Sequence, residues 1–154
     1  MSIITKIRSR PLLWLAYLLF VASMLLPTFA IDLGNNGNPV QPGYKVFLGG
    51  PVGALGIIAE PGGEAGNRVL GIYYLCTWLA NFALLLPFLT ILSATLRRVF
   101  AAAFTVLAWS IIASFFLIDD MLISGIGIGY YLWSLAITLV LFDLMADHGE
   151  TVPD

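Results

Sequence analysis

The chain has 154 residues, of which 60% are hydrophobic and only 10% are charged. A soluble domain carries about 25% charged residues because its surface must be solvated, so this composition excludes an ordinary soluble protein and favours one that faces lipid. The formal net charge is −2, and the basic residues are too few and too scattered to indicate a nucleic-acid partner.

Four long stretches of the chain contain no charged residue. Each reaches the length of about 20 apolar residues that a helix needs to cross a bilayer core of about 30 Å. The sequence therefore predicts an all-α membrane protein, a bundle of four transmembrane helices in a single domain. The expected spans cover residues 12–30, 70–94, 99–118 and 121–144.

The first stretch also has the layout of a cleavable signal peptide, with basic residues before an apolar run and small residues near Ala30. Because the uncharged run is long enough to span a bilayer, we expect it to remain as the first transmembrane helix. Pro27 lies near the outer end of this helix, where the loss of one backbone donor costs little.

A long loop, residues 32–68, follows the first span and holds ten glycines and four prolines. Its segment 46–59 is uncharged but too short to span, and its glycines and proline oppose a long regular helix. We expect a short helix or a pair of turns, with strand-like pieces, that is either re-entrant or interfacial. The loop either caps the helix ends or acts as a lid or a surface for a partner.

The distribution of basic residues predicts the orientation of the bundle. Five of the seven lie in the N-terminal segment or between the second and third spans, whereas the long loop holds two. Because basic residues favour the cytoplasmic side, both termini are expected in the cytoplasm and the loop in the periplasm. The short connections after the second and third spans make those helices antiparallel neighbours.

Asn81 lies in the middle of the second span, where an unpaired amide is costly in hydrocarbon. Polar or aromatic side chains recur at helical spacing before it, so one helix face carries the polar groups. This face makes either an interhelical hydrogen bond or a contact with a ligand or ion. The candidate side chains for these contacts are Asn81, Thr77, Tyr74, Trp78, Tyr130 and Trp133. Pro87, on the same span, is expected to kink it and to free the Ala83 carbonyl.

Gly125 and Gly129 form a small-xxx-small pair at the start of the fourth span, and such a pair lets another backbone approach closely. The neighbour is either another helix of the same chain or a second copy. Near the other end of this span, Asp143 lies at a depth where Arg97 or Arg98 can reach it, which predicts an interfacial ion pair of small net worth.

No arrangement of residues predicts catalysis, a metal site or a cofactor. His148 is the single histidine and Cys76 the single cysteine, so neither a zinc site nor a nucleophile with its base can be assembled. We therefore expect no catalytic residues, no metal ligands and no cofactor.

The runs WLAN (residues 78–81) and GYYLW (residues 129–133) resemble a pattern in small bacterial membrane proteins of unassigned function. Those proteins are similar to this chain in having four spans and a long Gly-rich loop after the first. The resemblance implies a bacterial inner-membrane location and carries no function. A proline often follows WLAN in those proteins, whereas Phe82 stands here.

Three classes of function are compatible with these patterns. A non-enzymatic interaction protein is favoured, because the recognisable sequence features are those that pack helices together. Such a protein is an accessory subunit, an oligomeric scaffold or an immunity-type binder whose partner is another membrane protein or itself. The alternative is a small pore or a ligand-binding membrane protein with a polar site around Asn81. An enzyme is disfavoured, because no pair of titratable groups converges.

Overall fold

The computed structural model describes residues 10–31, 39–60, 65–117 and 123–146. Helices dominate this part of the chain, and three short strands form one sheet. The described elements in chain order are α2 (Pro11–Leu25), β1 (Pro27–Ile31), β2 (Val40–Pro42), α3 (Gly43–Ala59), α4 (Ala65–Leu79), the 3-10 helix η2 (Ala80–Phe88), α5 (Ala94–Leu117), β3 (Ile123–Ile126) and α6 (Ile128–Ala146).

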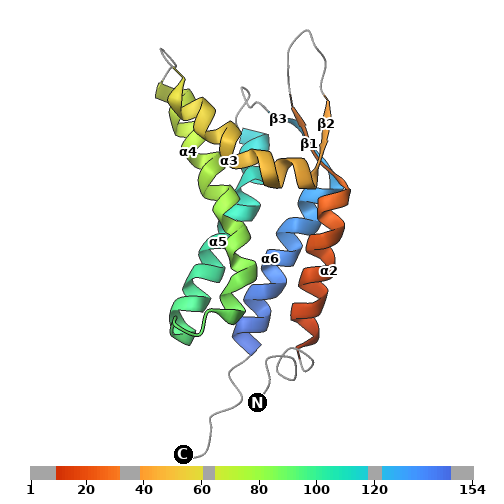
Figure 1. Ribbon diagram of the computed structural model, residues 1–154, viewed down its shortest axis with the longest axis vertical. Coiled ribbons are helices and arrows are strands. Elements are labelled where there is room, and N and C mark those ends of the chain that lie inside the picture. Colours follow the sequence, from red (N-terminus) through yellow and green to blue (C-terminus); the bar gives the residue numbers. More distant parts are fainter. Residues whose placement is uncertain (1–9, 32–38, 61–64, 118–122, 147–154) are drawn as a thin grey trace, which may run out of the picture.

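The elements form a bundle that is closed at one end (Figure 1). Helices α2, α5 and α6 and the α4–η2 segment run side by side, and α3 crosses the bundle at the end where the sheet lies. Helix α6 is central, because it packs against α2, α5 and η2, while α3 packs mainly on α4. Helix α2 begins and α6 ends at the opposite end of the bundle.

Three helical segments are long and apolar enough to cross a membrane: Ala65–Phe88, Ala94–Ser114 and Ile128–Ala146. They correspond to the second, third and fourth predicted spans. Helices α2 and α3 are apolar but shorter. The described part of the chain thus has the helices of a membrane protein, and the fourth span, expected at residues 12–30, stays a prediction.

The first apolar stretch is not one continuous helix. Helix α2 ends at Leu25, and Leu26 adopts an extended conformation with φ −95° and ψ 158°. A residue before proline is sterically driven out of the helical region, so Pro27 ends the helix and begins β1. The expected helix over 12–30 is therefore wrong in its last turn.

Strand β1 is the central strand of the sheet, in the order β2-β1-β3, and both pairings are antiparallel. Phe29 lies opposite Gln41 of β2 on one side and Ile126 of β3 on the other. The sheet therefore joins the end of the first apolar stretch, the long loop and the approach to α6.

The predicted glycine seam on the fourth span is corrected by this sheet. Gly125 lies in β3 and Gly129 in the first turn of α6, so the pair does not share a helix face. A Cβ added to Gly129 would lie 2.7 Å from Thr28 Oγ1 and 2.8 Å from the Pro27 carbonyl oxygen. The close neighbour of Gly129 is thus strand β1 of the same chain.

Helix α3 is longer and more regular than the composition of the loop predicts. It runs for 17 residues through Pro51. Its inner face packs so closely on α4 that a Cβ added to Gly71 would lie 2.8 Å from Ile58 Cγ1 and 3.0 Å from the Ala54 carbonyl oxygen. Tertiary packing of this face outweighs the low helix propensity of glycine and proline.

Helix α5 begins at Ala94 rather than near residue 99, so Arg97 and Arg98 are helical rather than in a loop. Ser93 acts as the N-cap, because its Oγ accepts a hydrogen bond from the Leu96 backbone N–H at 3.2 Å. A serine at this position is a sequence signal for a helix that begins at Ala94.

The predicted partner of Asp143 is also corrected. Asp143 pairs with Arg10 at 2.6 Å, and the two side chains are only 6% and 11% exposed. Arg98 instead donates from Nε to the Leu144 carbonyl at 3.1 Å. The reason is topological: α2 packs along α6, which brings the beginning of α2 beside the last turns of α6.

Gly129→Ala is expected to lower the free energy of unfolding by about 1–3 kcal/mol, because the new methyl group must displace strand backbone. Gly125→Ala is the matched control, since a Cβ there would lie 3.5 Å from the Ala30 Cβ, an ordinary contact. Chemical unfolding in mixed micelles measures both variants. A Gly129→Ala protein as stable as the wild type would contradict the close packing of α6 on β1.

Candidate ligand site beneath helix α3

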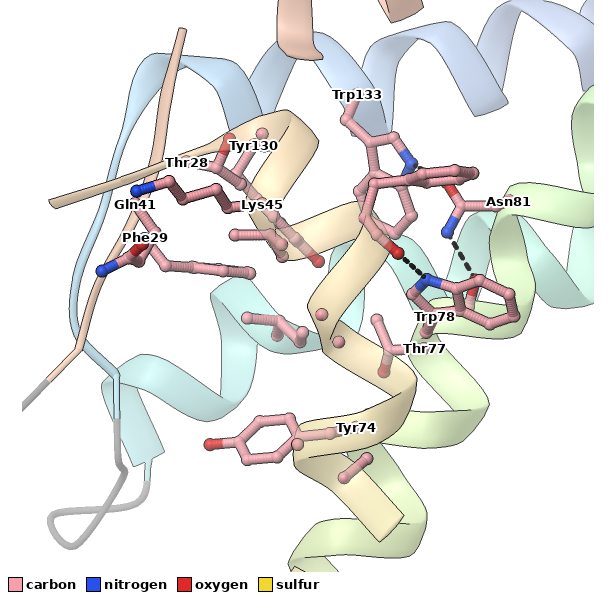
Figure 2. A pocket seen from close by; sticks show the side chains of 18 of the residues that line it. Thr28, Phe29, Gln41, Lys45, Tyr74, Thr77, Trp78, Asn81, Tyr130 and Trp133 are labelled. Atoms are coloured by element: carbon pink, nitrogen blue, oxygen red, sulfur yellow. Dashed lines mark hydrogen bonds between the residues drawn. The ribbon is translucent and has the colours of Figure 1, made fainter. Parts of the chain in front are cut away.

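A cavity of about 410 Å³ lies beneath α3, with walls from α2, α3, α4, α5, α6, η2 and the strands β1 and β2 (Figure 2). Small-molecule sites in proteins have volumes of about 300–1,000 Å³ and mostly apolar walls with a few polar groups. This cavity has both properties, because aliphatic and aromatic side chains and glycines make up most of its lining.

The structure brings all six side chains of the predicted polar site to this one cavity. Helix α4 contributes three of them, η2 one and α6 two. The six are Tyr74, Thr77, Trp78, Asn81, Tyr130 and Trp133. Helical spacing in the sequence connected the four on the second predicted span, and the packing of α6 against η2 brings Tyr130 and Trp133 to them.

Trp78 connects the wall of the cavity to α3. Its indole Nε1–H donates to the Phe47 carbonyl at 2.8 Å. In an α-helix the Phe47 carbonyl would accept from the N–H of residue 51, but that residue is Pro51 and has none. The indole therefore satisfies the carbonyl that the proline leaves without a helical donor. Gly50 leaves room for this contact, since a Cβ there would lie 3.1 Å from Trp78 Cδ1.

Asn81 connects α4 and η2 to α6. Its Nδ2 donates to the Trp78 carbonyl at 2.6 Å, and its Oδ1 accepts from Trp133 Nε1 at 2.9 Å. The interhelical hydrogen bond expected of this amide is therefore present. A primary amide has two N–H donors and two acceptor lone pairs, so Asn81 retains capacity for one further donor and one further acceptor contact.

The remaining hydroxyls of the site differ in how well they are satisfied. Thr77 donates to the Tyr73 carbonyl at 3.0 Å, and the Tyr130 hydroxyl donates to the Ala108 carbonyl. The buried Tyr74 hydroxyl has no hydrogen-bond partner among the described residues. This hydroxyl therefore keeps its hydrogen-bonding capacity for a further group, and it belongs to a residue of the cavity wall.

Pro87 leaves a backbone carbonyl without its helical donor, as predicted, but this carbonyl is not that of Ala83. The segment after Asn81 is a 3-10 helix rather than a kinked α-helix, so Pro87 removes the donor for Leu84, three residues earlier, instead of for Ala83. The Tyr17 hydroxyl of α2 donates to the Leu84 carbonyl at 2.5 Å. An aromatic donor from another helix again satisfies the carbonyl.

Sequence reasoning missed the part of the cavity that comes from the loop. Gln41, the middle residue of β2, and Lys45, in the first turn of α3, also line it. Figure 2 shows both on the side of β1 and β2, across the cavity from Asn81 and Trp78. One signal was available: Lys45 is the single charged residue between Asp32 and Glu60.

Within the described ranges, no group of three or more His, Cys, Asp and Glu side chains comes together in a way that could hold a metal ion. Cys76, half-buried in α4, is a free thiol. The chemistry that the cavity offers is therefore hydrogen bonding, apolar contact and the charge of Lys45.

Trp78→Phe is expected to lower the free energy of unfolding by about 1–3 kcal/mol, because the Phe47 carbonyl loses its donor. In a Pro51→Ala background the cost should shrink, since the new N–H of residue 51 can donate to that carbonyl. Unfolding titrations in mixed micelles of the wild type, the two single variants and the double variant give the coupling free energy between positions 78 and 51. Trp109→Phe, which removes an exposed indole bonded to Thr138, is the control and should be insensitive to residue 51. Equal cost of Trp78→Phe in both backgrounds would disprove the role of the indole.

No known protein family matches this chain, and no similar protein was found among curated proteins or solved structures. The geometry of the cavity is therefore the basis on which a function can be inferred.

Proposed function

We propose that this chain is a bacterial inner-membrane protein with four spans that binds a small, mostly apolar molecule in the cavity beneath α3. The three helices long enough to cross a membrane are taken with α2 as the fourth span. The distribution of basic residues supports cytoplasmic termini and a periplasmic α3 and sheet. The resemblance of the WLAN and GYYLW runs supports the bacterial inner membrane.

The first span is proposed to be α2 continued by β1. A helix of 15 residues rises roughly 22 Å, which is short of a bilayer core of about 30 Å, and an extended strand supplies the remainder. Strand backbone at membrane depth needs hydrogen-bond partners from protein. Strand β1 has them on both sides, because it is the central strand of the sheet.

The cavity is the observation that carries the proposed binding function. All three candidate spans contribute to its walls, through residues such as Trp78, Ile111 and Trp133. Its walls are mostly apolar, which favours an apolar ligand over the passage of ions. The free capacity of Asn81 and the unpartnered Tyr74 hydroxyl provide polar contacts that would orient the ligand. We propose binding without catalysis.

The ligand site can be tested by filling the cavity from α3. Gly53 lines the cavity and Gly56 does not, and a Cβ at either position meets no atom within 4 Å. Gly53→Phe is expected to weaken binding of an apolar probe by at least about tenfold, because the ring takes the volume of the probe. Gly56→Phe, on the same helix, is the matched control and should bind as the wild type does.

The probe is 11-bromoundecanol in nanodiscs, and the measurement is quenching of tryptophan fluorescence by the bromine atom. The exposed Trp14 and Trp109 are replaced by Phe, so that the signal comes from Trp78 and Trp133 of the cavity. Saturable quenching that Gly53→Phe weakens and Gly56→Phe leaves unchanged is the expected result. Quenching that does not saturate, or that both variants retain, would contradict the proposal.

A second candidate is the interaction protein expected from the sequence, and the outer face of α3 favours it. Tyr44, Leu48, Val52 and Leu55 lie on this face and are 46%, 71%, 73% and 53% exposed. An apolar row on the helix that covers the end of the bundle is suited to packing against another membrane protein or a second copy.

Replacement of Leu48 and Val52 by glutamine is expected to lower the fraction of oligomer if a second copy covers this face. Val69→Gln is the control, because Val69 is 67% exposed on α4, outside the row. Single-molecule photobleaching in nanodiscs counts the copies. A wild-type protein that is monomeric throughout would exclude the homo-oligomer.

A further inference from the structure

The chemical class of the ligand can be narrowed, on the basis of the proposed binding function, from the charge at one end of the cavity. We infer that the cavity binds a single-chain amphiphile of the surrounding bilayer, with an anionic head group at Lys45 and its apolar chain between α3 and α4.

Lys45 is the source of the positive charge. It lines the cavity and is itself exposed. No aspartate or glutamate lines the cavity, and no carboxylate of the described residues forms an ion pair with Lys45. Within the described ranges, the lining of the cavity thus holds one positive charge and no carboxylate, a combination that favours an anion over a neutral or cationic group.

The neighbours of Lys45 are suited to a polar head group. Gln41 lies on the same side of the cavity, and its amide can both donate and accept hydrogen bonds. The rest of the lining on α3 is apolar, with residues such as Val46, Phe47 and Ile57 and the glycines at 49, 50 and 53. A molecule with a charged end and one long apolar end fits this distribution better than a uniformly polar or uniformly apolar one.

The apolar part of the cavity has room because α3 offers little side-chain volume there. A Cβ added to Gly49 or Gly53 would meet no atom within 4 Å. The indole rings of Trp78 and Trp133 form the opposing surface and are held by hydrogen bonds to Phe47 and Asn81. The cavity of about 410 Å³ has the volume that an acyl or alkyl chain needs. The bilayer is the source of the ligand, because all three candidate spans contribute to the walls.

The test compares three probes that share one brominated undecyl chain and differ in the head group: sulfate, alcohol and trimethylammonium. They are titrated into zwitterionic nanodiscs, and quenching of Trp78 and Trp133 is measured in the background with Trp14 and Trp109 replaced by Phe. The sulfate is expected to bind about fivefold more tightly than the alcohol, the effect of one exposed ion pair, and the ammonium more weakly than either.

Lys45→Gln should abolish the preference for the sulfate over the alcohol, and Lys45→Arg should retain it. Arg68→Gln is the matched control, since Arg68 is an exposed basic residue of α4 that does not line the cavity. Loss of the preference in Arg68→Gln would assign it to surface charge and overturn the inference.

The remaining outcomes separate the inference from the proposed function. Equal affinity of the wild type for the three probes would overturn the anionic head group while the binding function stands. The absence of saturable quenching by any of the three would overturn both. A preference that persists in Lys45→Gln would disprove the assignment to that residue.

Discussion

The satisfaction of backbone carbonyls that proline leaves without donors is the constraint on which this structure depends. A proline inside a helix removes one N–H, and in an apolar environment the carbonyl it would have bonded needs another partner. Pro51 does this to Phe47, and Pro87 does it to Leu84. In both cases an aromatic side chain from a different helix donates, the Trp78 indole at 2.8 Å and the Tyr17 hydroxyl at 2.5 Å. These two bonds tie α3 to α4 and η2 to α2.

The same constraint explains why the sheet closes the bundle. Once Pro27 ends α2, the following backbone has no helical hydrogen bonds, and it obtains partners from β2 and β3 on its two sides. Strand β3 leads directly into α6, so α6 begins against the backbone of β1, and this is possible because Gly129 has no side chain there. At the other end, the buried pair of Arg10 and Asp143 joins the beginning of α2 to the last turns of α6. The α2–α6 pair is thus fixed at both ends.

The sequence predicted what depends on composition and on period. Charge-free length identified the helices that can cross a membrane, and helical spacing connected Tyr74, Thr77, Trp78 and Asn81, which line one side of the cavity. It could not predict that α2 lies along α6, and so the partner of Asp143 was assigned to Arg97 or Arg98 by depth alone. The start of α5 at Ala94 could have been predicted, because Ser93 is a residue type that commonly caps a helix N-terminus. Strand β1 was hidden because its residues are as apolar as a helix end, and only its pairing with distant segments makes it a strand.

The cavity results from the way in which Trp78 supplies a donor to the Phe47 carbonyl. For its indole to reach the Phe47 carbonyl, Trp78 must approach the backbone of α3, and glycine at position 50 allows this. The neighbouring glycines of α3 add no side chain to this wall, and on the other side the bond to Asn81 holds the indole of Trp133. Apolar side chains that face such a space lack packing partners on that side, and hydrogen bonds hold two of the wall residues, Trp78 and Trp133. Occupation by a chain of similar polarity restores the lost contacts without breaking those bonds, which is the physical reason to regard the cavity as a binding site.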